Sequence, residues 1–161
     1  MLNPKHTSFA LLLAGLLGLG TIVLPAAAHH GFTGAYDATS PLYVEGTVEA
    51  VTLAYPHVEM TVAVPADITV PDVLPGLDVL GIPDAQAKIA PIEADTYDLQ
   101  MAGTEFVTDL ADRIQVNDRV SLVALRNCLP PHEIRSRWIR VASGDVVTVA
   151  GETQAEVQGC D

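Results

Sequence analysis

The chain has 161 residues, of which 20 are acidic and 8 are lysine or arginine, and its formal net charge at pH 7 is −12. Nucleic acid and anionic lipid both present dense negative charge, so an acidic chain is a poor match for either. We therefore expect no nucleic-acid partner. The charge suits a soluble exported protein, and it permits cationic partners or metal ions.

The first 28 residues show the three-part pattern of a secretory signal peptide. Lys5 precedes an uncharged apolar stretch over residues 9–24, and the small residues Ala26 and Ala28 fit the A-x-A cleavage rule. The apolar stretch is shorter than the roughly 20 residues that span a bilayer. We predict cleavage after Ala28, a mature chain that begins at His29, a periplasmic or secreted location, and no stable membrane anchor after cleavage.

Removing 28 of 161 residues leaves a length that suits one domain with one core. Residues 29–41 form an irregular lead-in, because glycine, serine and proline interrupt any periodic pattern. Residues 42–161 form the single β domain. Within it, residues 65–91 contain five prolines and little regular pattern, so we interpret them as a surface insertion, with a short helical turn over residues 85–90.

Apolar and polar residues alternate over residues 42–50 and again over residues 57–64, which predicts two half-buried strands. His57 opens the second strand and faces away from the core. A third strand over residues 97–101 stops at Gly103. Helical spacing of apolar residues after Thr104, a suitable N-cap, predicts a short helix up to residue 114. Further strands are expected over residues 119–125, 136–142 and 146–150.

Three strands, a helix and two more strands follow the order of the oligonucleotide/oligosaccharide-binding (OB) fold, a small five-stranded barrel. We predict a mainly β protein with an OB-like barrel of five to six strands and one short helix between strands 3 and 4. An open α+β sheet with the helix on one face is the alternative, and neither arrangement by itself defines an activity.

The chain contains two cysteines, Cys128 and Cys160. In an oxidising compartment two cysteines most simply form a disulfide, and we predict this pair. The bridge would close a loop of about 32 residues and stabilise the fold by roughly 3–4 kcal/mol in the chain-entropy model. A metal site on these two sulfurs is less favoured, because they lack the short C-x-x-C spacing.

Several short motifs occur together along the chain. They are His29-His30-Gly31-Phe32 at the expected mature start, then Tyr36-Asp37, Gly46-Thr47-Val48, Pro56-His57 and Val116-Asn117-Asp118-Arg119-Val120. The set resembles a family of small exported bacterial proteins catalogued as a domain of unknown function. Members typically begin the mature chain with His-His-Ser-Phe and carry Gly-Thr-Val before Asn-Pro-His, so this chain departs at Gly31 and Tyr55. The resemblance implies export and a shared fold.

Three histidines form the candidate metal site: His29, His30 and His57. A mature chain that starts with histidine offers its terminal amine and its own imidazole as a chelating pair, and a second imidazole completes a planar set of nitrogens. Such a set favours copper(II). We predict a copper(II) site made by His29 and His57, with His30 as an alternative ligand. The arrangement resembles the histidine brace of copper proteins outside the cytoplasm. The competing interpretation is a mobile terminus and an ordinary strand-edge histidine.

No catalytic constellation is evident in the sequence. It has no nucleophile elbow, no phosphate-binding glycine loop and no metalloprotease helix, so we predict no catalytic residues and disfavour an enzyme.

Three functional hypotheses follow. The leading one is an exported, non-enzymatic binding module, with copper(II) at its N-terminal histidines as an optional feature. The alternative is a metal-free interaction module of the cell envelope, which binds a protein partner through its polar β face or through the insertion. The third is a copper-dependent oxidase or monooxygenase, which matches the ligands but has no evident substrate surface. The sequence leaves the oligomeric state open.

Overall fold

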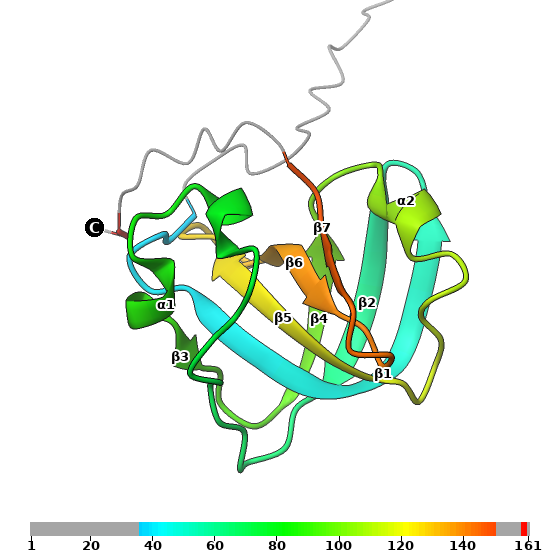
Figure 1. Ribbon diagram of the computed structural model, residues 1–161, viewed down its shortest axis with the longest axis horizontal. Coiled ribbons are helices and arrows are strands. Elements are labelled where there is room, and N and C mark those ends of the chain that lie inside the picture. Colours follow the sequence, from blue (N-terminus) through cyan, green and yellow to red (C-terminus); the bar gives the residue numbers. More distant parts are fainter. Residues whose placement is uncertain (1–35, 151–158, 161) are drawn as a thin grey trace, which may run out of the picture.

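Five strands close into a barrel in the computed structural model, which describes residues 36–150 and 159–160 (Figure 1). The predicted signal peptide, its cleavage site and the histidines at positions 29 and 30 lie outside the described residues. The barrel strands are β1 (Leu42–Ala54), β2 (His57–Ala63), β4 (Thr96–Met101), β5 (Arg119–Arg126) and β6 (Ile134–Arg140).

The order of neighbours around the barrel is β2-β4-β6-β5-β1, and β1 closes the ring by pairing with β2. All of these pairings are antiparallel except that between β4 and β6. This is the pairing order expected of an OB barrel, so the predicted fold is confirmed and the open-sheet alternative is wrong. Two short strands extend the sheet: β3 (Ala90–Pro91) beside β1 and β7 (Val146–Thr148) beside β6.

Three short helices accompany the strands among the described residues: the 3-10 helix η1 (Leu77–Leu80), α1 (Ala85–Lys88) and α2 (Phe106–Asp109). The helix predicted between the third and fourth barrel strands is α2, one turn long, and its Phe106 is buried in the barrel core. Along the described residues, no helix is both long and apolar enough to cross a membrane.

Strand β1 closes the barrel because its two halves have different partners. Residues 42–47 pair with β5, whereas residues 47–54 pair with β2. Gly46 lies at the crossing, where a Cβ atom would stand only 2.1 Å from the backbone oxygen of Ala63. A register shift between Val48 and Ala50 follows at once. Glycine and a bulge are typical devices for bending a strand around a barrel corner.

The bulge also changes which side chains face the interior. Before it, Val44 and Val48 are fully buried, as the alternation predicts. After it, Ala50 is exposed, and Val51 and Leu53 pack against the core instead. The sequence-based expectation that Ala50 continues the apolar face is therefore wrong. One extra residue in a strand exchanges its two faces, because side chains alternate with a period of two.

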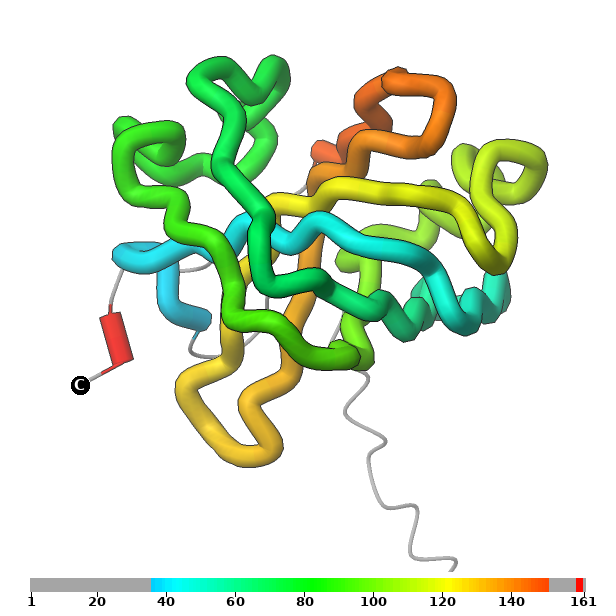
Figure 2. The backbone as a smooth tube through the Cα atoms, turned by 90° about the horizontal axis from the view of Figure 1, so that it is seen from below, coloured from blue at the N-terminus to red at the C-terminus, as the bar shows by residue number. Residues whose placement is uncertain are grey.

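Outside the barrel lies a second apolar core. The insertion (residues 65–91) runs along the outer wall and returns beside the start of β1, where Ala90 pairs with Leu42 (Figure 2). Its buried side chains pack against outward-facing residues of β1, β5 and β6. The indole nitrogen of Trp138 donates a hydrogen bond to the carbonyl of Pro75 at 2.7 Å. The insertion thus packs against the outside of the barrel and brings apolar residues that cover one wall.

The lead-in, the tail and the β5–β6 loop meet at one end of the barrel. Tyr36 is buried and forms a β-bridge with Asn127 in that loop. Cys128, the next residue, lies at disulfide distance from Cys160, with 5.2 Å between their Cα atoms, as predicted. Gly159 packs close to Thr39 of the lead-in. The pair of cysteines therefore holds the described end of the tail against the barrel (Figure 1).

Candidate ligand-binding face

A groove of about 410 Å³ lies on the outer face of β1, β2 and β4. This part of the barrel wall contains the second half of β1. No residue of the groove lining belongs to the second apolar core. Residues from all three strands line it, together with Glu133 at the end of the β5–β6 loop and Ile134, the first residue of β6. The polar members of this lining are Thr52, Glu59, Thr61, Asp98, Gln100 and Glu133.

Strand alternation explains why polar side chains gather in the groove. Met60 and Val62 face the barrel core and are buried, so Glu59 and Thr61 point outward. The register between β2 and β4 then places Glu59 opposite Gln100 and Thr61 opposite Asp98. The Thr61 hydroxyl donates a hydrogen bond to the Asp98 carboxylate at 2.6 Å. Four polar side chains thus form a two-by-two array on the outer face.

The groove lining carries negative charge and no lysine or arginine. Glu133 pairs with Arg135 at 3.2 Å, and the Arg135 guanidinium lies 5.7 Å from the centre of the Tyr36 ring. Glu133 is therefore partly neutralised. Within the described part of the chain, Glu59 and Asp98 take part in no ion pair. Their charges are available to a ligand.

Gln100 adds an acceptor to the floor of the groove. Its side-chain oxygen is buried and accepts no hydrogen bond from any described residue. A buried acceptor without a donor costs roughly 1–3 kcal/mol relative to a satisfied one, so a donor from a ligand would stabilise this position.

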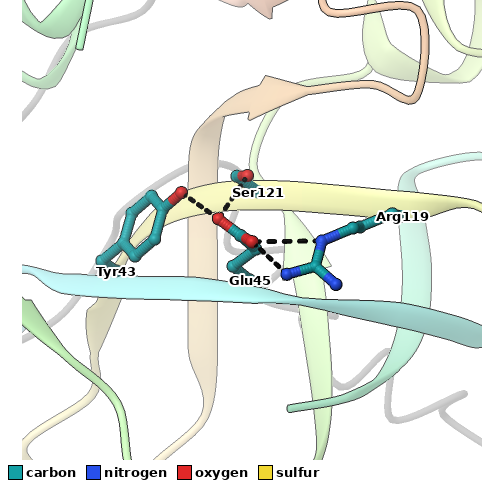
Figure 3. Close-up of polar contacts among 4 residues, drawn as sticks. All are labelled: Tyr43, Glu45, Arg119 and Ser121. Atoms are coloured by element: carbon teal, nitrogen blue, oxygen red, sulfur yellow. Dashed lines mark hydrogen bonds and ion pairs between the residues drawn. The ribbon is translucent and has the colours of Figure 1, made fainter. Parts of the chain in front are cut away.

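A second polar cluster, on the other half of β1, has a structural role (Figure 3). Glu45 accepts hydrogen bonds from the Tyr43 hydroxyl at 2.5 Å, from Arg119 Nε at 3.1 Å and from the Ser121 hydroxyl at 3.5 Å. It also forms an ion pair with the Arg119 guanidinium. Both carboxylate oxygens are engaged by residues of β1 and β5, so the cluster joins these two strands.

Burial raises the pKa of the Glu45 carboxyl, but the hydrogen bonds from Tyr43 and Arg119, together with the Arg119 charge, hold it below its usual range. Burial and the hydrogen bond to Glu45 raise the pKa of the Tyr43 phenol. Glu45 thus stays ionised and Tyr43 stays neutral at physiological pH. A carboxylate so fully bonded has no free oxygen for acid–base chemistry, and we assign no catalysis to it.

The histidine set predicted from the sequence is only partly described. His57 begins β2, as predicted, and is half-buried directly after the Tyr55–Pro56 peptide bond. His29 and His30 lie outside the described residues, so the copper site remains a prediction. No group of three or more histidine, cysteine, aspartate or glutamate side chains in the described ranges is arranged to hold a metal ion.

Sequence analysis missed most of the groove. The outward alternation of residues 57–64 and 97–101 already marked Glu59 and Asp98 as polar-face positions. The alternation alone does not show that β2 pairs with β4. That pairing brings Thr61 and Asp98 together, although they are 37 positions apart in the sequence.

No protein-family model matches this chain, and no curated protein matches it. Among solved structures, the chain is similar to the crystal structure of a mitochondrial single-stranded DNA-binding protein, Rim1, from S. cerevisiae. The two are 10% identical, with a TM-score of 0.41, and the similarity covers 64% of this chain and 93% of that chain.

This finding corrects one expectation. Net charge led us to exclude a nucleic-acid partner, whereas the similar structure is that of a single-stranded DNA-binding protein. We withdraw the exclusion. The physical reason is that net charge is a sum over the chain and does not report where charge lies. Five of the six arginines are on two neighbouring strands, β5 and β6: Arg119, Arg126, Arg135, Arg137 and Arg140.

Proposed function

We propose that this chain is an exported, non-enzymatic binding module whose ligand surface is the groove on the outer face of β1, β2 and β4. One observation carries the proposal: the insertion covers the wall formed by β5, β6 and the first half of β1, while the groove lies on the remaining wall. In OB folds the face of the second and third barrel strands binds oligonucleotides and oligosaccharides, and these strands correspond to β2 and β4 here.

Export is part of the proposal and has two supports. The first 28 residues have the pattern of a cleavable signal peptide, with Lys5 before the apolar stretch. The two cysteines lie at disulfide distance, and disulfides persist mainly in oxidising compartments. We therefore assign the module to the periplasm or the medium.

The ligand surface is tested by mapping amide chemical shifts in isotope-labelled mature protein. Three probes of different chemistry are added separately: a lysine–threonine hexapeptide, an oligothymidine and cellohexaose. We expect at least one of them to shift the amides of Thr61, Asp98 and Gln100 more than those of the insertion. Shifts confined to the insertion, or no shifts with all three probes, would contradict the proposal.

A copper site at the mature N-terminus is the second candidate function. His57 supports it, because this half-buried imidazole stands at the exposed end of the β1–β2 hairpin. Tyr36 is buried in the second core and is seven positions after His29. The chain between these two residues can span at most roughly 25 Å. The chelate would use the His29 amine and imidazole with the His57 imidazole, and His30 would be the alternative ligand.

Calorimetry with copper(II) and zinc(II) tests this site on protein that begins at His29. We expect copper(II) to bind more tightly than zinc(II). We also expect a glycine added before His29, or His57→Ala, to weaken copper binding at least about tenfold, because each change removes a nitrogen from the set. Equal copper affinity with the added glycine would exclude the brace.

A further inference from the structure

We propose that the groove binds an extended basic peptide segment in which lysine or arginine occupies alternate positions. The inference rests on the proposed function and names its ligand class. It follows from the chemistry and the spacing of the groove residues, which are separate observations.

The chemistry of the lining calls for hydrogen-bond donors. Carboxylates of Glu59, Asp98 and Glu133 and the amide oxygen of Gln100 are all acceptors, and no cationic side chain shares the lining. Lysine and arginine carry only donors on their charged groups, so their side chains complement this surface. Ala50, exposed after the bulge, is an apolar member of the lining, against which the methylene stem of such a side chain packs.

The spacing of the carboxylates matches an extended chain. Glu59 stands opposite Gln100, and Asp98 precedes Gln100 by two residues on the same face of β4. Such diagonal neighbours on a sheet lie about 7–8 Å apart. In an extended peptide, side chains at positions i and i+2 point the same way and are separated by about 6.6–6.8 Å. Two basic residues separated by one residue therefore reach both carboxylates.

Other occupants fit less well. A second copy of this chain would bring a net charge of −12 against an acidic groove, and the two copies would repel. One metal ion needs several oxygen ligands within about 2–2.6 Å of a common point, a requirement that diagonal carboxylates do not meet. Oligonucleotide is retained as a competing ligand in the test below.

The test measures peptide binding to mature protein by calorimetry. The probe is a capped hexapeptide of sequence Lys-Thr-Lys-Thr-Lys-Thr. Two comparison peptides separate charge from spacing: Lys-Lys-Lys-Thr-Thr-Thr has the same composition, and Glu-Thr-Glu-Thr-Glu-Thr has the opposite charge. We expect the alternating lysine peptide to bind most tightly and the glutamate peptide not to bind. The affinity of the alternating lysine peptide should fall as the salt concentration is raised, because exposed ion pairs are screened.

The decisive variant is Glu59→Gln with Asp98→Asn, which removes two charges and preserves shape. We expect a loss of affinity of about tenfold, as two partly exposed ion pairs would give. The matched control is Asp109→Asn with Asp112→Asn, which removes two charges from exposed positions outside the groove lining. It should bind the peptide as the parent does. Circular dichroism verifies that both variants fold.

Three results would overturn the peptide proposal. They are an equal loss in the control variant, equal binding of the block peptide Lys-Lys-Lys-Thr-Thr-Thr, and binding of spermidine or oligothymidine in the groove more tightly than the alternating peptide. The last result would leave the proposed ligand surface intact and change only its ligand. Failure of every probe to perturb the groove would remove both proposals.

Discussion

Replacing Trp138 with alanine should lower the free energy of unfolding by about 3–5 kcal/mol. The side chain is fully buried in the second core, outside the barrel, and its indole nitrogen donates to the Pro75 carbonyl. The Arg140 guanidinium lies 5.4 Å from its ring centre. Alanine removes the largest fully buried side chain of the second core. Urea unfolding followed by circular dichroism measures the loss.

Trp138→Phe is the matched control for this variant. Phenylalanine retains much of the apolar volume but leaves the Pro75 carbonyl without its donor, so the expected cost is about 1–2 kcal/mol. Hydrogen exchange should show the alanine variant losing protection first in the insertion, because the interior core of the barrel is a separate cluster. Equal costs for the two variants would mean that the indole volume does not hold the insertion to the barrel.

Gly46→Ala should destabilise the barrel by about 3 kcal/mol or more, at the upper end of what overpacking costs. A Cβ atom there would stand 2.1 Å from the Ala63 oxygen and 2.8 Å from a methyl carbon of Val62. The first of these atoms belongs to the backbone of β2, so the strand itself must shift. The shift would fall where β1 passes from β5 to β2 and closes the ring.

A second glycine separates the steric effect from the conformational one. Gly144 has a φ of 92°, but a Cβ atom added there meets nothing within 4 Å. Gly144→Ala should therefore cost only the conformational penalty, about 1–2 kcal/mol. Thermal and urea unfolding of both variants decide the comparison. A Gly46→Ala cost no greater than that of Gly144→Ala would show that β1 and β2 separate easily at the crossing.

The strands of this protein could be predicted because alternation is a local property of the chain. Met60 and Val62 recur with a period of two, and that period alone places Glu59 on the outer face. The order of strands and helix along the chain predicted the barrel but left an open sheet as the alternative. Two cysteines in a chain with a predicted export signal likewise left one simple pairing, and the structure places them at disulfide distance.

Tertiary contacts decided the rest, because they join residues that the sequence keeps far apart. The bulge after Val48 arises from barrel closure, and it exchanges the faces of the second half of β1. Trp138 lies on the outer wall of the barrel, and it becomes buried only when the insertion folds back over β5 and β6. The groove exists because the register of β2 with β4 aligns Glu59 with Gln100 and Thr61 with Asp98, and no local pattern encodes that register.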